Sequence, residues 1–308
     1  MQVHFGFEEL RPEWESAVGC IGTFDGVHLG HAEVISRAVA KAREAEQPCV
    51  LVTFDRHPAA VLAPSRCPKL VAPLQENLKR FEALGVSATV VLPFNAWLSR
   101  MSASTFLEDI LRKAVRADRL VVGHDFAMGN GREGNTEWLS QRIETVVVPP
   151  FQVESHRVSS SAIRAMVEAG DVAHAARLLG RPFTISGVVV RGDKLGAKLG
   201  YPTANLARSF DQVVPADGVY SGTFVCAKGT FKTAASIGTR PTVDGQDRRF
   251  EAYLLDYPGD TIYGYSADLL LHERLRGQEK FASLEGLIEQ MALDVDRVRT
   301  LLAAGGDR

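Results

Sequence analysis

The sequence feature that most constrains the fold is a glycine- and histidine-rich stretch, GTFDGVHLGH, at residues 22–31. An apolar run at residues 17–23 leads into it, and residues 32–46 follow without Gly or Pro and with apolar side chains at helical spacing. This pattern predicts a strand, a tight glycine loop and a helix. Glycines let the backbone approach a ligand closely, and the free N–H groups at a helix start favour phosphate. The stretch therefore predicts a phosphate-binding loop.

Two imidazoles lie where the predicted helix begins. His28 and His31 are three residues apart, and Phe24 and Asp25 precede them. A plain glycine turn with two surface histidines is the alternative interpretation. The strand–loop–helix context favours the functional interpretation, in which the histidines contact nucleotide phosphates.

The remainder of the first half alternates between strand and helix patterns. Strands are expected at residues 48–54, 87–92, 120–123 and 145–148, and helices at residues 75–84 and 104–115. Such alternation predicts parallel β-α-β units in an open twisted sheet, whose ligands bind beyond the carboxyl ends of the strands. Three stretches fall at strand ends: the glycine–histidine loop, residues 55–58 and residues 124–126. We expect them to form one site.

A second glycine pattern, GNGREG at residues 129–134, matches the dinucleotide-binding spacing. It follows the fourth strand pattern of the chain, at residues 120–123, and no long helix pattern begins after it, so we interpret it as a flexible loop. Further on, Ser159 and Ser160 are suited to cap a helix that runs to Glu168, with Arg164 in its first turns. Taken alone, this is a capped surface helix.

The texture of the sequence changes after Gly180-Arg181-Pro182, and we predict domains at residues 1–182 and 183–308. Short β-rich runs follow at residues 184–191, 218–226, 233–237, 250–256 and 267–273. Their spacing predicts a small antiparallel barrel. An apolar face at residues 283–302 predicts a C-terminal helix.

The second half carries its own signature, GDKLGAKLGYPTAN, at residues 192–205. Thr203 and Asn205 are two apart in an extended segment, so both point the same way and offer oxygen ligands suited to Mg²⁺. Glu251 alternates with Phe250 along a strand pattern, and a solvent-facing carboxylate is the commoner interpretation of such a residue. No P-loop pattern occurs, so a kinase here would be of another type.

Composition excludes several classes of function. The net charge of −2 argues against nucleic-acid partners, and no apolar run is long enough to span a bilayer. The four cysteines form no C-x-x-C pair, and Cys20 and Cys49 fall in strand patterns as buried thiols. We therefore expect a cytoplasmic protein. The sequence leaves open whether the protein forms a homo-oligomer.

These motifs together resemble the bacterial bifunctional riboflavin kinase/FAD synthetase family over nearly the whole chain. The family patterns are G-x-F-D-G-x-H-x-G-H, S-S-T-x-I-R, P-T-A-N and E-x-x-L-L-D. The resemblance implies a Rossmann-like nucleotidyltransferase domain followed by a riboflavin kinase barrel. It implies phosphorylation of riboflavin to FMN and adenylylation of FMN to FAD, with ATP as co-substrate and Mg²⁺ as cofactor.

The resemblance also implies roles for individual residues. His28 and His31 would act in adenylyl transfer, Glu251 would be the general base of the kinase, and Thr203 and Asn205 would hold the metal. The implied nucleotide or flavin contacts are Gly22, Phe24, Asp25, Gly26, Asp55, His57, Asp125, Ser159, Ser160, Arg164, Gly192, Asp193, Gly196, Lys198, Gly200, Pro202 and Arg276.

Four residues depart from the family pattern. Ser161 stands where the family has threonine and keeps the hydroxyl. Met128 replaces a usual aromatic, and Leu195 and Ala197 stand where arginine is common. An enzyme with one active half therefore stays open, as does a nucleotidyltransferase for another acceptor, although the P-T-A-N half argues against the latter. A non-enzymatic flavin carrier fits least, because binding alone needs no histidine pair in a phosphate loop.

Overall fold

The computed structural model describes all residues except 155, 193–199, 209–210, 243–244, 260 and 304–308. Side chains of residues 240–247 are also outside the description. The chain forms two compact units, Met1–Ser160 and Ser161–Arg308. The predicted boundary after Pro182 lies further along the chain. Between these two positions, helix α8 (Val172–Leu179) packs on strands of the second unit.

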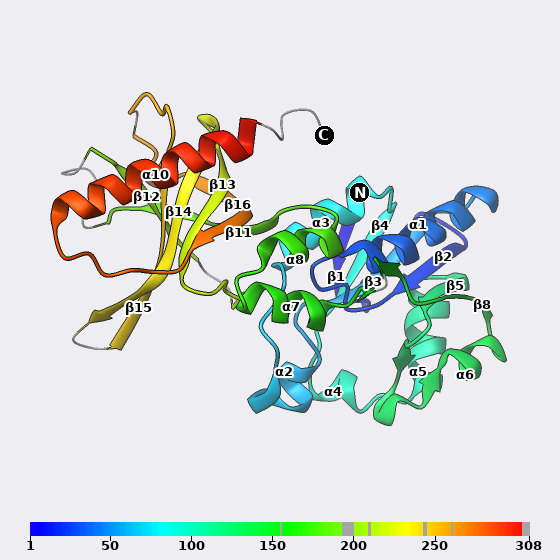
Figure 1. The fold of residues 1–308 in the computed structure, drawn as a ribbon. Helices are drawn as coiled ribbons and strands as arrows, with labels where there is room; N and C mark the ends of the chain where they lie inside the picture. The colour runs from blue at the N-terminus through cyan, green and yellow to red at the C-terminus, as the bar shows by residue number, and fades with distance from the viewer. Residues whose placement is uncertain (155, 193–199, 209–210, 243–244, 260, 304–308) are drawn as a thin grey trace. The chain divides into compact units, whose positions relative to one another are not determined.

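The first unit is built on a six-stranded sheet in which every pairing is parallel (Figure 1). The strand order is β1-β4-β3-β2-β5-β8. Their bounds are β1 (Gln2–Phe5), β4 (Ala88–Leu92), β3 (Cys49–Phe54), β2 (Ala17–Ile21), β5 (Ala117–Gly123) and β8 (Glu144–Val148). The predicted strands are confirmed. β1 adds a strand that periodicity missed, because it has four residues and none of them is fully buried.

Each face of this sheet has its own core. On one face, Cys20 and Leu51 pack with Ile35 of α1 (Leu29–Glu44) and Phe81 of α3 (Leu74–Ala83). On the other face, the alternate strand residues pack with a helical segment at Phe106–Ala114. Because successive strand residues point to opposite faces, near-continuous apolar strands bury both sides of the sheet.

The helix predicted at residues 104–115 has a less regular form than expected. It begins as α5 (Ala103–Thr105) and continues as a π-helix, η2 (Phe106–Ala114). The Val115 N–H donates to the carbonyl of Ile110, five residues earlier, at 2.8 Å. Wider helical turns of this kind are rare and usually short.

Short elements fill the connections between the strands of the first unit. They are α2 (Ala59–Leu62), η1 (Pro64–Arg66), α4 (Ala96–Ser99), β6 (Ala127–Met128), η3 (Asn130–Arg132), β7 (Gly134–Asn135), α6 (Thr136–Ser140), β9 (Gln152–Val153) and β10 (His156–Arg157). Residues 129–134, predicted as a flexible loop, lie in a β-hairpin in which Met128 pairs with Gly134. No long helix follows it, as expected.

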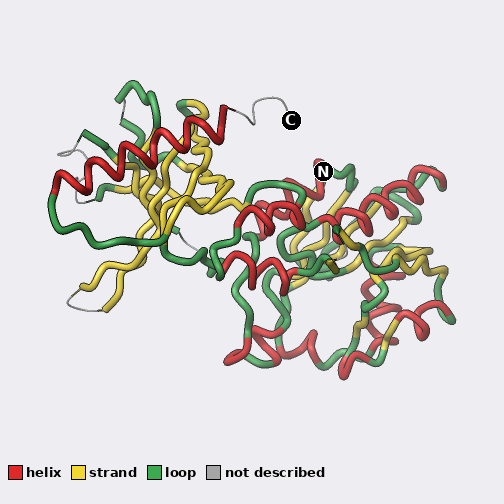
Figure 2. The backbone as a smooth tube through the Cα atoms, viewed as in Figure 1, coloured by secondary structure: helices red, strands yellow, loops and turns green. Residues whose placement is uncertain are grey.

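The second unit begins with α7 (Ser160–Glu168) and α8, and then closes into an antiparallel barrel (Figure 2). The barrel order is β11-β12-β15-β14-β13-β16. Their bounds are β11 (Phe183–Val190), β12 (Thr203–Ala207), β15 (Gly245–Leu254), β14 (Gly229–Thr242), β13 (Gly218–Cys226) and β16 (Ser266–Arg276). The predicted C-terminal helix is α10 (Leu284–Ala303), whose buried Val298 packs with Leu255 and Leu275.

Candidate active sites

The predicted phosphate loop connects β2 to α1 at the carboxyl end of the sheet's central strands. His28 is the N-cap of α1, and its Nδ1 accepts a hydrogen bond from the backbone N–H of His31 at 3.1 Å. Phe24, Gly26 and Val27 have φ angles of 46°, 83° and 39°. Left-handed backbone is unfavourable for Phe and Val, and such strain concentrates at functional sites.

The two histidines form a stacked pair. Their ring centroids are 3.6 Å apart and the rings are 16° from parallel. The Nδ1 atom of His31 is buried and has no hydrogen-bond partner in the described part of the chain. Burial, and to a smaller extent His28, holds the pKa of His31 well below its usual 6.5. His31 is therefore neutral near pH 7, and its side chain lines the cavity described below.

Asp25 has a structural task in this loop. Its carboxylate is buried and accepts hydrogen bonds from the backbone N–H groups of Val71, at 2.8 and 3.0 Å, and of Ala72, at 3.2 Å. A Cβ on Gly26 would lie 2.5 Å from Val71 Cγ1. The Ser160 hydroxyl donates to the Asp25 carbonyl at 3.0 Å. These contacts tie the loop to residues 71–72, so a nucleotide contact by Asp25 stays a prediction.

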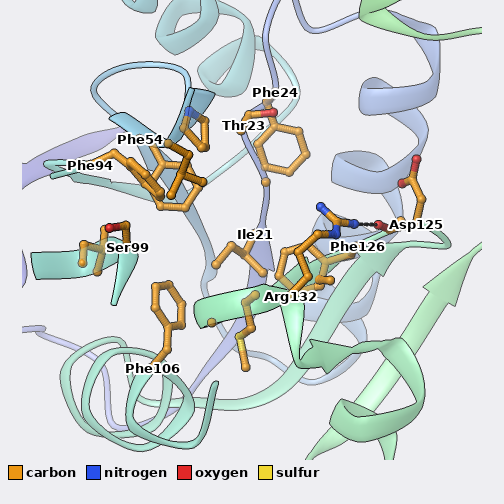
Figure 3. Close-up of a pocket in the computed structure, with 18 of the residues that line it drawn as sticks. Ile21, Thr23, Phe24, Phe54, Phe94, Ser99, Phe106, Asp125, Phe126 and Arg132 are labelled. Carbon is orange, nitrogen blue, oxygen red and sulfur yellow. Dashed lines mark hydrogen bonds between the residues drawn. The ribbon is translucent and has the colours of Figure 1, made fainter. Parts of the chain in front are cut away.

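A cavity of about 630 Å³ lies beside the loop (Figure 3). It is lined by residues from the ends of four parallel strands and from the hairpin β6–β7. Four residues predicted for the site line it: Gly22, Phe24, His31 and Asp125. Its other described walls are mainly apolar, with Phe54, Phe94, Phe106 and Phe126 among them. Such a cavity can take an aromatic ring system, with polar groups on one side.

The remaining predicted residues of this half support backbone turns. Asp55 Oδ1 accepts from the Phe94 N–H at 2.9 Å, and His57 Nδ1 accepts from the Ala59 N–H at 3.1 Å. Both line a separate small cavity of about 30 Å³, together with Asp25. The structure therefore brings the three predicted stretches to one edge of the sheet but divides them between two cavities.

Two further predictions concern the segment after the first sheet. Ser159 precedes α7, Ser160 is its first residue, and Arg164 follows one turn later. Arg164 belongs to the second compact unit, so its contact with the phosphate loop stays a prediction. Sequence reasoning missed Arg132, which lines the large cavity and donates from Nη2 to the Asp125 carbonyl at 2.9 Å. The glycine pattern at residues 129–134 marks the position of Arg132 in the sequence, but the pattern by itself predicts only a loop.

The barrel brings together the three residues predicted for the kinase. Thr203 and Asn205 lie on β12, and Asn205 is in register with Glu251 on β15. The Thr203 hydroxyl donates to Glu251 Oε2 at 3.4 Å. A Cβ on Gly192 would lie 2.4 Å from the Asn205 amide, so glycine is required there. These side chains form a partly exposed cluster of oxygen ligands.

The glycine-rich segment before β12 is described only at its ends. Gly200 has a φ of 85°, a conformation that glycine adopts without strain, and Pro202 directly precedes Thr203. The predicted contacts Asp193, Gly196 and Lys198 lie outside the described residues, as do Leu195 and Ala197.

Arg276 is held by the C-terminal helix. Its Nε lies 3.1 Å from both carboxylate oxygens of Asp294, and its Nη2 lies 2.8 Å from Oδ2. Asp294 is only 6% exposed and also accepts from Gln290 Nε2 at 3.0 Å. This bidentate pair joins β16 to α10, and a flavin contact by Arg276 stays a prediction.

Two features are absent from the described residues. No group of three or more His, Cys, Asp or Glu side chains is arranged to hold a metal ion there. No helix in that part of the chain combines the length and the apolar character needed to cross a bilayer.

Two family models match different parts of the chain. Residues 10–162 match the family model for FAD synthetase, and residues 179–302 match that for riboflavin kinase. Bifunctional riboflavin kinase/FMN adenylyltransferases from Pseudomonas fluorescens and Escherichia coli K12 are each 35% identical. The first alignment covers 100% of both chains, and the second covers 91% of both.

A solved structure has the same fold over nearly its whole length. It is titled as a macrolide-efflux protein from Streptococcus pneumoniae and is 30% identical, with a TM-score of 0.90. The match covers 97% of this chain and 99% of that one.

Proposed function

The chain belongs to the bifunctional riboflavin kinase/FMN adenylyltransferase family, and from that premise we propose which residues carry out each of its two reactions. The chain is an ATP-dependent transferase that phosphorylates riboflavin to FMN and then adenylylates FMN to FAD. Its substrates are riboflavin, FMN and ATP.

We assign adenylyl transfer to the cavity beside the phosphate loop. An oxygen of the FMN phosphate bonds to the α-phosphorus of ATP, and the bond from that phosphorus to the β-phosphate oxygen breaks. Pyrophosphate leaves with the electron pair. Because the attacking oxygen is already anionic, the site needs no strong base. It needs donors for the charge that develops on phosphoryl oxygens.

The histidine pair supports this assignment. Because His28 Nδ1 accepts a backbone N–H, the neutral ring carries its proton on Nε2 and can donate there. Neutral His31 and the start of α1 add further donors, together with the positive end of the helix dipole. The capped, stacked pair beside a large cavity is the observation that carries the proposal.

We assign phosphorylation of riboflavin to the barrel. The 5′-hydroxyl of riboflavin bonds to the γ-phosphorus of ATP, the bond to the β-phosphate oxygen breaks, and ADP leaves with the electron pair. Glu251 accepts the hydroxyl proton in this scheme. Its position in register with Asn205 and within 3.4 Å of the Thr203 hydroxyl supports the assignment. Such transfer depends mainly on positioning and charge neutralisation.

The same cluster fits a magnesium ion bound together with ATP. Thr203 and Asn205 offer neutral oxygens, and Gly192 leaves space against the Asn205 amide that any Cβ would fill. Magnesium prefers oxygen ligands and keeps several waters or phosphate oxygens, so two protein ligands suffice. When bound, the ion would neutralise charge on the transferred phosphoryl group. Thr203 and Asn205 would hold it, and Glu251 would stay free to take the proton.

We also propose a cytoplasmic location. All four cysteines are free thiols, and Cys20 and Cys49 are buried. Burial, with a smaller effect of Cys49, raises the pKa of Cys20, and burial raises the pKa of Cys49 to about 12. Free thiols are typical of reducing compartments.

Turnover of riboflavin with ATP and Mg²⁺, followed by chromatography of the flavins, tests the two assignments. We expect the double variant His28→Ala, His31→Ala to accumulate FMN and form no FAD. We expect Glu251→Gln to make no FMN from riboflavin but to convert added FMN to FAD. A variant that abolished both steps alike would contradict two independent sites.

A further inference from the structure

Among the described residues that line the large cavity, Arg132 alone has a permanent positive charge. Of these described residues, only His31, Asp125 and Arg132 are ionisable, and His31 is neutral near pH 7. The reaction assigned to this cavity joins two anionic substrates. Arg132 therefore has the charge that the rest of the lining lacks, and guanidinium keeps its charge at every physiological pH.

The structure holds the backbone of Arg132 in place. The hairpin β6–β7 is fixed to the start of α5, because Glu133 accepts from the Ala103 N–H at 2.7 Å and Gly129 touches the Ala103 backbone. A Cβ on Gly129 would lie only 2.4 Å from that nitrogen. Between these contacts the chain turns through Gly131 and Arg132, with φ angles of 64° and 61°. Arginine in this left-handed region is strained, and strain of this kind is commonly retained where a side chain must point to a ligand.

The neighbouring Asp125 carboxylate does not neutralise the charge of Arg132. Its Nη2 donates to the carbonyl oxygen of Asp125, at 2.9 Å, and not to the carboxylate. That carboxylate pairs with Arg157 instead, at 2.8 Å. The Arg132 side chain is exposed to solvent, and a guanidinium has five N–H donors, so most of them face no protein acceptor in the described part of the chain.

We propose that Arg132 binds a phosphate group of the substrates of adenylyl transfer, which rests on the assignment of that reaction to this cavity. Figure 3 shows Arg132 beside Asp125, on the side of the cavity away from Phe54 and Phe94. An aromatic ring system fits among the phenylalanines, and its phosphate-bearing end then faces the guanidinium. The phosphate belongs either to FMN or to ATP, and the planar fork of arginine suits both.

Steady-state kinetics of FAD formation test this role in the full-length enzyme. Arg132→Gln should lower kcat/KM about tenfold to a hundredfold, as expected for the loss of a charge-assisted hydrogen bond. Arg132→Lys keeps the charge without the fork and should recover part of the loss. The matched control is Arg37→Gln, which removes an exposed arginine of α1 that pairs with Glu33 and does not line the cavity. Riboflavin phosphorylation in the same preparations should be unchanged in all three.

The KM values for FMN and for ATP identify which substrate carries the phosphate that Arg132 binds. A higher KM for FMN alone assigns Arg132 to the FMN phosphate. A higher KM for ATP, with weaker inhibition by pyrophosphate, assigns it to the ATP phosphates. Unchanged kinetics in Arg132→Gln overturn the inference, as does a loss that Arg37→Gln reproduces or that Arg132→Lys does not relieve. If the wild-type enzyme forms no FAD, the proposed function itself fails, and the two failures are thus distinct.

Discussion

The His28 ring accepts the backbone N–H of His31 through Nδ1 and lies flat against the His31 ring, with the centroids 3.6 Å apart. One contact sets where α1 begins, and the other excludes water from one face of each ring. His28 therefore combines two roles, one in the helix cap and one in the proposed chemistry. Substitution can separate them.

Replacing His28 with asparagine should remove the chemistry and keep the cap. Asparagine is a good N-cap acceptor, whereas alanine has no acceptor and typically costs about 1 kcal/mol of stability. We expect both His28→Asn and His28→Ala to lower kcat for FAD formation by about 10²- to 10³-fold, as for loss of one preorganised donor. Only His28→Ala should also lower the Tm. Near-normal FAD formation by His28→Asn would remove His28 from the chemistry.

His31 should make the first unit less stable as the pH falls. The unfolded chain binds the His31 proton near pH 6.5, whereas the folded chain resists protonation until a lower pH. The stabilising contribution is therefore complete above about pH 6.5 and is lost as the pH falls toward the lowered pKa of the folded state. Urea unfolding at pH 7.5 and pH 5.5 should show a smaller loss in His31→Gln than in the wild type.

Tryptophan fluorescence isolates the first unit in that measurement. The three tryptophans, Trp14, Trp97 and Trp138, all lie within Met1–Ser160. The exposed His156, outside the histidine pair, supplies the control substitution as His156→Gln. An equal loss of stability in the wild type and in His31→Gln would show that His31 is not the group that resists protonation.

Removing the Asp25 carboxylate should release the phosphate loop from residues 71–72. Asp25→Ala leaves the buried N–H groups of Val71 and Ala72 without their acceptor and should cost about 2–3 kcal/mol in the unfolding free energy of the first unit. Asp25→Asn keeps one acceptor oxygen and should cost less. Fluorescence-detected unfolding measures both. Asp118→Ala, at an exposed carboxylate, should change the stability far less, and equal effects at Asp25 and Asp118 would contradict the clamp.

Breaking the Arg276–Asp294 pair should detach α10 from the barrel. Asp294→Asn removes one partner of a largely buried pair, a change that typically costs about 3–5 kcal/mol. Hydrogen exchange across residues 284–303 should accelerate. The exposed pair between Asp256 and Arg299 is the control, and Asp256→Asn should leave that exchange unchanged. A raised KM for riboflavin with normal exchange would instead support the flavin contact that the sequence suggested for Arg276.

Much of the architecture could be predicted because apolar periodicity records burial. Strands such as Cys49–Phe54 are buried on both faces and read as unbroken apolar runs, and the barrel strands are separated by Gly, Pro and Asp clusters. β1 was not predicted because its side chains are exposed or only half-buried and form no apolar run. The hairpin β6–β7 was not predicted because a strand of two residues is too short to show an alternation of apolar and polar residues. A π-helix has no distinct signature in the apolar pattern.

The site was predicted less completely, because sequence spacing does not show which atoms a polar group faces. Asp25 and Arg276 were predicted to contact ligands, yet each makes strong hydrogen bonds within the protein. Partners of this kind come from residues 46 positions away for Asp25 and 18 positions away for Arg276, a separation that no local pattern encodes. Arg132 was missed for the same reason. Its charge is available to a ligand because the Asp125 carboxylate pairs with Arg157 instead.

The strand order has a consequence for how this enzyme is made. β2, which leads into the phosphate loop, pairs with β3 on one side and with β5 on the other, where Ala17 opposes Ala117. A growing polypeptide can form the first pairing early, but the second needs β5, whose Ala117 lies a hundred residues after Ala17. The adenylyltransferase half thus acquires its central strand pairing late in its own synthesis. A translation pause at any point between β3 and β5 would leave one edge of a nascent β2 unpaired for as long as the pause lasts.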